Sequence, residues 1–308
     1  MLAERGFERY ALLTTERALA TMPALGEDAD RVLDVAPGAV PEAAAAVRDD
    51  VGGRPLVALG GGRVIDAAKA IAGADGLVTA AVPTTLSGAE MTPFHRMPAG
   101  VDDFSFVRPS LVIAVPSLMA SAPPPDLVAS AMNALAHAIE ALYTPMADPV
   151  SEQAALGAIA DIALGLRLQP PDRTDLSRGA LFAGYASGVA GFAVHHAVCQ
   201  TIVRLTGSPH ARTNAVMLPH FVRMMEGRVP GAIADVSTAI GVESDPPAAA
   251  DAISELSAQT GVTRLSELGV QPSAIDDIVA ASLAHPAIGN TPDPPDAAEL
   301  RALLQAAL

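Results

Sequence analysis

Histidine and amide side chains recur at helical spacing in the second half of the chain. Asn133 and His137 are four residues apart, and His196 and Gln200 repeat that spacing, so each pair points to one face of a helix. His210 follows shortly after the second pair. Imidazoles gathered in this way bind a divalent cation or move a proton. A single histidine in an apolar helix is most simply a hydrogen-bonded core residue, but three of them in helices poor in charge favour a site.

A run of three glycines lies where a phosphate-binding turn is expected. Gly60, Gly61 and Gly62 follow the apolar run 55–59 and precede a stretch of helical composition at 64–72. Backbone N–H groups at a helix N-terminus attract a pyrophosphate, and the missing Cβ atoms allow close approach. An ordinary tight turn is the alternative, but the order of strand, glycines and helix favours a nucleotide site.

Two further groups of residues lie close to these glycines. Asp66 and Lys69, the only lysine of the chain, are one helical turn apart and most simply form an exposed ion pair. The segment 83–92 follows another apolar run and carries hydroxyl groups at the carboxyl edge of the expected sheet, where open α/β sheets bind ligands. Those hydroxyls belong to Thr84, Thr85 and Ser87. Turn residues without a ligand are the simpler interpretation of this loop.

The elements that position these residues change in character along the chain. Apolar strand-like runs alternate with helical stretches in the first part, which predicts a parallel sheet with crossover helices. The expected strands are 9–15, 55–59, 76–82 and 111–115, and the expected helices are 39–50 and 64–72. After Pro123-Pro124-Pro125 helical patterns dominate, ending in a helix at 297–308. We expect a nucleotide-binding α/β domain at 1–120 and a helical domain with the histidine site at 121–308.

Composition narrows the class of protein. The chain has 308 residues, half of them hydrophobic, but no apolar run long enough to cross a bilayer. Because its first residues carry acids and lack an apolar stretch, we do not expect them to act as a signal peptide. The single cysteine, Cys199, excludes an intrachain disulfide and favours a cytoplasmic enzyme. A formal net charge of −15 argues against a nucleic-acid partner. An anionic metabolite is not excluded, because the local electrostatic potential of a pocket can oppose the negative potential of the protein as a whole.

Taken in order, these motifs resemble the iron-type (group III) alcohol dehydrogenases, and within them the maleylacetate reductase branch. The segment 60–69 is similar to a GGGS-x-x-D-x-x-K phosphate loop, and 83–92 to a PTT loop that ends in Glu-Met-Thr. The segment 133–140 is similar to a D-A-L-x-H-x-x-E helix. Two further histidine segments match at 195–200 and 209–220.

The resemblance implies a dehydroquinate-synthase-like fold, with a Rossmann-like N-terminal domain, an all-α C-terminal domain and a cleft between them. It implies hydride transfer with NAD(H) or NADP(H), and a homodimer. A divalent metal, zinc or iron, would be held by Asn133, His137, His196 and His210. The expected cofactor-binding residues are Thr15, Gly60, Gly61, Gly62, Asp66, Lys69, Thr84, Thr85 and Ser87. The expected catalytic residues are His137, His195, His196, His210, Gln200 and Arg96.

Three departures from the family pattern bear on these expectations. Asn133 stands where most members have an aspartate, which removes a negative charge from the metal site, although the reductase branch also tends to carry asparagine. Gln200 replaces a histidine and cannot exchange a proton near neutral pH. Arg63 replaces the serine of the glycine loop and either pairs with a cofactor phosphate or is solvated.

The resulting hypothesis is a reductase of a small unsaturated or oxo carboxylic acid. The nicotinamide cofactor would lie across 60–62 and 84–85, and the imidazoles would stabilise the developing negative charge, with an imidazolium as the proton source. Arg96 or Arg212 would grip the substrate carboxylate. Thr15, at the end of the first strand, would not repel a 2′-phosphate, so NADP is expected to be tolerated.

Two other readings of the motifs stay open. A metal-dependent alcohol dehydrogenase would carry zinc or iron that tracks with its activity. A lyase or cyclase on the same scaffold, or a pseudo-enzyme that only binds a partner, would fit the changes at Arg63 and Gln200. Failure to bind NADH would leave only this last class.

Overall fold

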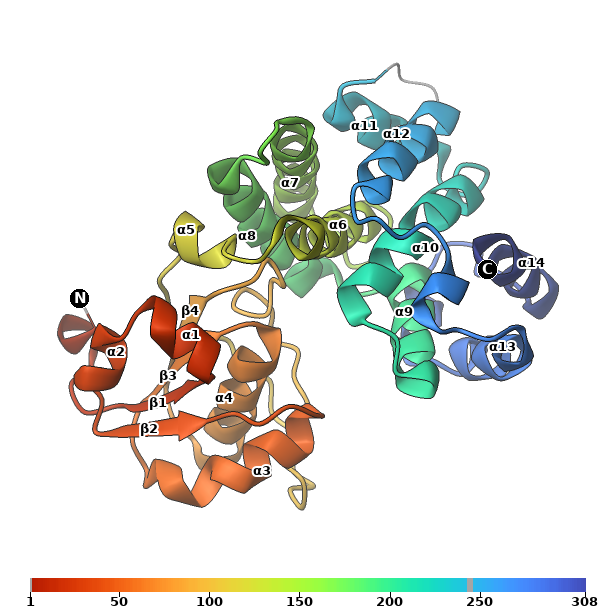
Figure 1. Cartoon of the computed structure of the whole chain (residues 1–308). Helices are drawn as coiled ribbons and strands as arrows, with labels where there is room; N and C mark the ends of the chain where they lie inside the picture. The colour runs from red at the N-terminus through yellow and green to blue at the C-terminus, as the bar shows by residue number, and fades with distance from the viewer. Residues whose placement is uncertain (1, 243–245) are drawn as a thin grey trace. The chain divides into compact units, whose positions relative to one another are not determined.

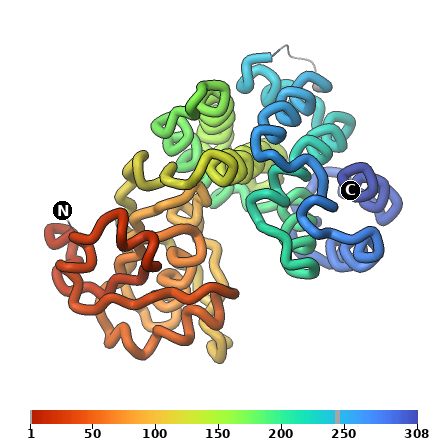
Figure 2. Tube along the Cα trace, in the orientation of Figure 1, coloured from red at the N-terminus to blue at the C-terminus, as the bar shows by residue number. Residues whose placement is uncertain are grey.

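The structure is a computed structural model that describes residues 2–242 and 246–308. The chain divides into two compact units, Met1–Ser121 and Ala122–Leu308. Each unit is a continuous stretch of the chain, as the colour gradient shows (Figures 1 and 2). The first contains a sheet with helices, and the second is helical.

The first unit is built on a five-stranded sheet in which every neighbouring pair of strands is parallel, in the order β2-β1-β3-β4-β5. The strands are β1 (Ala11–Thr14), β2 (Arg31–Asp34), β3 (Leu56–Gly60), β4 (Thr79–Pro83) and β5 (Leu111–Val112). In this order the chain reverses direction across the sheet between β1 and β3. Ligands of open α/β sheets bind at such a switch point, outside the carboxyl ends of the strands.

Helices cover both faces of this sheet because its central strands are apolar on both sides. Alternate residues such as Leu13 and Ala58 pack with α3 and α4, whereas Leu12, Val57 and Leu59 pack with α1, α2 and α5. The helical segments are η1 (Ala3–Arg5), α1 (Glu16–Thr21), α2 (Ala24–Glu27), α3 (Val40–Val51), α4 (Gly62–Asp75) and α5 (Pro116–Met119). The result is a three-layer unit whose loops at the carboxyl edge carry the predicted nucleotide residues.

The regular elements of the second unit are all helices in its described residues, joined by turns and loops (Figure 1). Its α-helices are α6 (Pro124–Ala141), α7 (Pro149–Arg167), α8 (Arg173–Ala190), α9 (Val194–Thr206), α10 (His210–Met225), α11 (Pro230–Ile240), α12 (Pro246–Ala258), α13 (Ile275–Leu283) and α14 (Ala297–Ala307). Short 3₁₀ segments are η2 (Leu265–Leu268), η3 (Pro272–Ala274) and η4 (Pro286–Asn290). Helix α6 is buried almost all round and contacts α7, α8, α9, α10 and α12, so it forms the centre of this unit.

The predicted fold class, an α/β unit followed by an all-α unit, is confirmed. The sequence missed β2 and overestimated β5, which ends at Val112. Within the described part of the chain, no single helix is long and apolar enough to cross a membrane; the pair α8 and α9 passes that test only jointly, with a bend of 100° between them.

Candidate functional site

The first unit contains a cavity of about 260 Å³ at the carboxyl ends of β1, β3 and β4. Its walls are formed by Thr15, Arg17, Gly61, Gly62, Arg63, Val64, Thr84 and Thr85. The cavity therefore gathers predicted cofactor residues from three loops at the switch point of the sheet. A hydrogen bond of 2.9 Å from the Thr84 N–H to the Gly60 carbonyl joins two of these loops.

The glycines of the turn are required by close packing as well as by any ligand. A Cβ atom on Gly60 would come within 2.6 Å of the Val64 side chain, and one on Gly61 within 2.9 Å of the Thr85 methyl group. On Gly62 it would lie 3.1 Å from the Ser87 hydroxyl oxygen. Because Gly61 and Thr85 both line the cavity, a side chain at Gly61 would enter the space where a nucleotide is expected.

Polar atoms in the cavity wall are left without partners by the protein. In the described part of the chain the Nε of Arg63 and the Oγ1 of Thr85 are buried without a hydrogen-bond partner. Buried donors of this kind are rare unless a ligand or water completes them. Thr15 has a structural role, because its Oγ1 accepts from the Ala18 N–H at 3.3 Å and caps α1.

Lys69 and Asp66 lie on α4, and neither is among the residues that line the cavity. The sequence suggested an exposed ion pair between these two residues. In the structure they lie 2.8 Å apart, but the Lys69 side chain is 0% exposed, so the pair is buried at its lysine end. Its Nζ also donates to the carbonyls of Ala89, Thr92 and Phe94 at 2.8, 3.1 and 2.7 Å. An ammonium has three protons, so these contacts leave none for a phosphate. In this structure the lysine anchors the loop that follows β4.

The second unit brings His137 and His196 together in its core. Their rings are stacked with centroids 4.5 Å apart, and the Phe192 ring lies 4.8 Å from that of His196. Asn133 precedes His137 by one turn of α6 and is also buried. Three buried atoms of this group, Asn133 Oδ1, His137 Nδ1 and His196 Nε2, find no hydrogen-bond partner among the residues the structure describes.

Glu140 organises this cluster, and sequence reasoning did not single it out as a site residue. The carboxylate accepts from the backbone N–H groups of His195 at 2.7 Å, Ala193 at 3.1 Å and His196 at 3.3 Å. It also lies 2.6 Å from His196 Nδ1. Helix α9 has no side-chain cap of its own at Ala193. A carboxylate from α6 therefore caps α9 from another helix. The glutamate of the D-A-L-x-H-x-x-E motif was the available signal.

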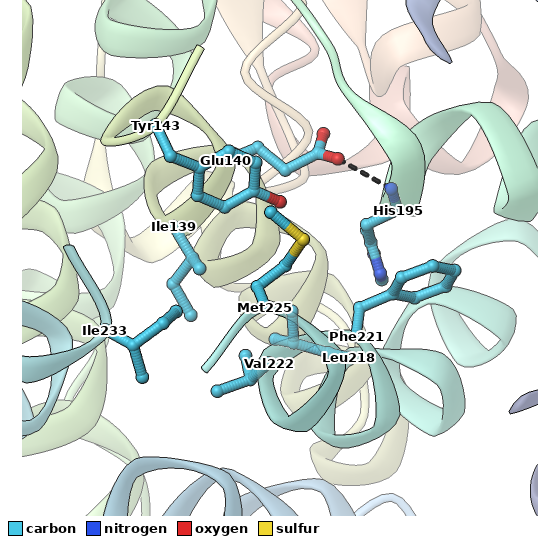
Figure 3. A pocket seen from close by; sticks show the side chains of 9 residues that line it. All are labelled: Ile139, Glu140, Tyr143, His195, Leu218, Phe221, Val222, Met225 and Ile233. Atoms are coloured by element: carbon cyan, nitrogen blue, oxygen red, sulfur yellow. Dashed lines mark hydrogen bonds between the residues drawn. The ribbon is translucent and has the colours of Figure 1, made fainter. Parts of the chain in front are cut away.

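His195 is a hydrogen-bonded core residue, which was the simpler sequence interpretation. Its Nε2 lies 2.9 Å from Asn214 Oδ1, and its ring contacts Phe221 edge-on. Figure 3 shows it beside an apolar gap that Glu140 and Tyr143 also line, together with side chains such as Leu218 and Met225. That gap has no room for a water molecule, so it is a feature of packing and not a substrate pocket.

The remaining predicted site residues are more accessible. His210 is exposed at the start of α10, and Asn214 Nδ2 lies 3.4 Å from its Nε2. Gln200 is partly buried on α9, and Arg96 is exposed in the loop after β4. Arg212 forms an ion pair with Asp126 at 2.9 Å through one terminal nitrogen, which leaves other N–H donors of the guanidinium for a substrate carboxylate.

Burial governs the ionisation of the histidines. Loss of solvent lowers the pKa of His137 and His196 well below the usual value, and lowers that of His195 to about 3. These imidazoles are therefore neutral near pH 7, which disfavours the imidazolium proton source expected from the sequence.

The donor set does not match a resident divalent metal well. Asn133 supplies a neutral amide oxygen, and the one carboxylate in contact with the cluster, Glu140, is turned toward α9 and His196 Nδ1. Across residues 2–242 and 246–308, no group of three or more His, Cys, Asp or Glu side chains is arranged to hold a metal. The metal set Asn133, His137, His196 and His210 stays a prediction.

Comparison with known proteins decides the family. Residues 127–308 match the model of the Fe-containing alcohol dehydrogenase family, C-terminal. The maleylacetate reductase 1 of Rhodococcus opacus is 37% identical over 264 residues, which are 82% of this chain and 72% of that protein. The chain belongs to the iron-containing alcohol dehydrogenase family. The maleylacetate reductase of Sphingobium indicum is 34% identical over 81% of this chain and 73% of its own length.

A solved structure of the family shows the same architecture. The crystal structure of maleylacetate reductase from Agrobacterium tumefaciens covers 100% of this chain and 91% of its own, with a TM-score of 0.85 and 28% identity. The expected resemblance and fold are thereby confirmed. The family also makes the chain an oxidoreductase, and its maleylacetate reductase relatives confirm the expected function class, a nicotinamide-dependent reductase.

Proposed function

We propose that this iron-containing alcohol dehydrogenase family member reduces a small unsaturated or oxo carboxylic acid of the maleylacetate type with NADH or NADPH. The observation that carries the proposal is the cavity at the switch point of the sheet, with its glycine turn and its unpartnered Arg63 Nε and Thr85 Oγ1. A dinucleotide needs N–H donors at a helix N-terminus and close backbone approach, and Gly61 and Gly62 supply both.

In the proposed reaction, residues of the second unit would stabilise the charge that develops during hydride transfer. A bound reduced nicotinamide supplies a hydride to an electron-poor carbon. Negative charge then develops on the conjugated oxygen of the acceptor and needs preorganised donors. Burial keeps the His137 imidazole neutral near pH 7, and His137 and the exposed His210 are the candidates to donate a ring N–H to that oxygen. His195 already bonds Asn214, and we assign it no direct part.

NADP tolerance follows from the residue that ends the first strand. Thr15 lines the cavity and carries no charge that would repel a 2′-phosphate. Aspartate is as good a helix N-cap as threonine, so Thr15→Asp keeps the cap of α1. We expect the variant to bind NADPH about tenfold more weakly, a difference of about 1.4 kcal/mol, with NADH affinity little changed. An unchanged ratio of the two dissociation constants would count against this placement of the ribose.

The direct test of the activity is an assay of NADH and NADPH oxidation with a panel of oxo acids, including maleylacetate, and aldehydes. Metal analysis of the same purified sample separates the alternatives. The proposal expects turnover of the oxo acids. Turnover confined to aldehydes and proportional to bound zinc or iron would identify a metal-dependent alcohol dehydrogenase instead.

Three further expectations belong to the proposal. The substrate is a small anion, for which Arg96, exposed in the loop after β4, and Arg212 are the candidates to bind the carboxylate. A homodimer follows from the family resemblance, and size-exclusion chromatography with light scattering tests it. A cytoplasmic location rests on the single cysteine, Cys199, which is a buried free thiol.

A further inference from the structure

We propose that Glu140 is a positioning residue that holds His196 as the neutral tautomer with its proton on Nδ1, so that His196 presents the bare Nε2 as a hydrogen-bond acceptor. The tautomer is a property of the second unit alone. Its catalytic consequence rests on the proposed function: His196 then accepts a hydrogen bond or proton from the ligand and does not donate one.

The hydrogen bonds around Glu140 set the direction of the contact with His196. Its two oxygens lie within hydrogen-bond distance of the backbone N–H groups of Ala193, His195 and His196. Burial raises the pKa of Glu140, but the three backbone N–H donors at the start of α9 oppose that rise and favour the ionised carboxylate, which can only accept hydrogen bonds. At 2.6 Å from Glu140 Oε2, the Nδ1 of His196 must therefore carry the hydrogen.

The opposite nitrogen of the same ring is left without a partner. His196 Nε2 is buried, and the described residues offer it no hydrogen bond. In a neutral imidazole with a proton on Nδ1, Nε2 carries only a lone pair. A buried acceptor without a partner is costly, so a group outside the protein is the expected partner.

The orientation of the ring is fixed from several sides. Phe192 stacks on one side at 4.8 Å and His137 packs at 4.5 Å. The backbone N–H of His196 bonds the same carboxylate that receives its Nδ1–H, so the helix and the side chain share one anchor. The turn before α9 begins at Gly191, whose φ of 78° is accessible to glycine at little cost. Glu140 thus fixes both where α9 starts and which way His196 points.

The tautomer is measured directly in the wild-type protein. Two-bond ¹H–¹⁵N correlation spectra of protein labelled at histidine report which ring nitrogen carries the proton, and a His196→Gln variant assigns the signal. The proposal expects His196 to be protonated on Nδ1 with Nε2 bare. A proton on Nε2, or an imidazolium near pH 7, would overturn it.

A variant tests the consequence for activity. In Glu140→Gln the amide can donate to Nδ1, which moves the His196 proton to Nε2. We expect that shift in the spectrum and a fall in kcat of about 10- to 100-fold, with the KM for NADH unchanged. The matched control is Glu152→Gln, an exposed glutamate in the first turn of α7. A folded Glu140→Gln variant with the wild-type tautomer and wild-type kcat would contradict the proposal.

The tautomer and the catalytic function are tested by separate measurements. If Glu140→Gln does not fold, the wild-type spectrum still decides the tautomer. If the wild-type protein binds neither NADH nor NADPH, the proposed function fails, while the position of the His196 proton is still measured.

Discussion

Buried ionisable side chains account for most of the chemistry at the scale of single residues. His137, His196 and Glu140 lie in the core of the second unit, and Lys69 and Glu90 in that of the first. A buried polar group is costly unless it is hydrogen-bonded. Glu140 and Lys69 are fully satisfied by protein groups, whereas His196 is satisfied on one nitrogen only. Among the described residues, His196 therefore keeps one ring nitrogen without a protein partner.

Glu90 gives a pH-dependent prediction at this scale. Its side chain is 1% exposed, and burial raises its pKa to about 7 from the usual 4.5. The folded state therefore holds a proton that the unfolded state loses, and the free energy of unfolding falls as pH rises from about 4.5 through about 7. The loss is on the order of 2–4 kcal/mol. Glu90→Gln removes this pH-dependent contribution. The free energy of unfolding of the variant should therefore rise relative to that of the wild type across this pH range.

Urea unfolding of the wild type and of Glu90→Gln at several pH values between 5 and 8 measures this difference in the free energy of unfolding. Other buried groups, including Glu140 and the histidines, contribute to the slope in both proteins, so the difference between the two curves is the relevant quantity. Two parallel curves would show that Glu90 is ionised and solvated in the folded state.

Sequence reasoning was strong on which residues belong to the sites and weaker on what each one does. Spacing placed Asn133 and His137 on one face of α6, and the structure agrees. Spacing does not reveal that His195 forms a hydrogen bond with Asn214, or that Glu140 caps α9 from another helix. Those contacts join segments 19 and 55 residues apart, and only the packed helices define them.

At the scale of elements, Lys69 connects α4 to the loop that lines the cavity. Its ammonium holds the carbonyls of Ala89, Thr92 and Phe94 beside Asp66. Lys69→Met leaves that carboxylate and the carbonyls without their cation, and we expect a loss of about 3–5 kcal/mol in the free energy of unfolding. Urea unfolding with an unchanged m-value measures it.

The control for this variant is Arg48→Met. Arg48 forms an ion pair with Asp75 whose side chains are 31% and 30% exposed, and such pairs contribute about 0–1 kcal/mol. Equal losses in the free energy of unfolding would mean that the buried Lys69 stabilises the fold no more than an exposed ion pair does. Because the anchored loop carries Thr84 and Thr85, weaker nucleotide binding should accompany the instability.

The strands show where periodicity succeeds and where it fails. β1, β3 and β4 are apolar on both faces and stand out as continuous hydrophobic runs. β2 lies at the edge of the sheet, and its four residues begin with Arg31 and end with Asp34, so no apolar run marks it. Pairing with β1 creates this strand, and a single sequence carries little sign of it.

At the scale of the whole molecule, each unit contributes one part of the proposed reaction. The first unit has a cavity suited to a dinucleotide, and the second has imidazoles whose free nitrogens are suited to a polar substrate. The net charge of −15 opposes anionic ligands in general. Local features must therefore attract the cofactor, and the helix N-terminus at Gly61 with Arg63 beside it provides them.

The central claim is that a nicotinamide dinucleotide binds in the cavity at Gly61. Fluorescence titration with NADH tests it on the wild type, on Gly61→Ala and on Gly61→Ala/Thr85→Ser. The added methyl group enters the cavity and crowds the Thr85 methyl group, which lies 2.9 Å from the new Cβ position. The second change relieves that crowding. We predict saturable binding by the wild type and affinity at least about tenfold lower in both variants, equivalent to about 1.4 kcal/mol, with stability recovered in the double variant. No NADH binding by the wild type, or wild-type affinity in the double variant, would contradict the account.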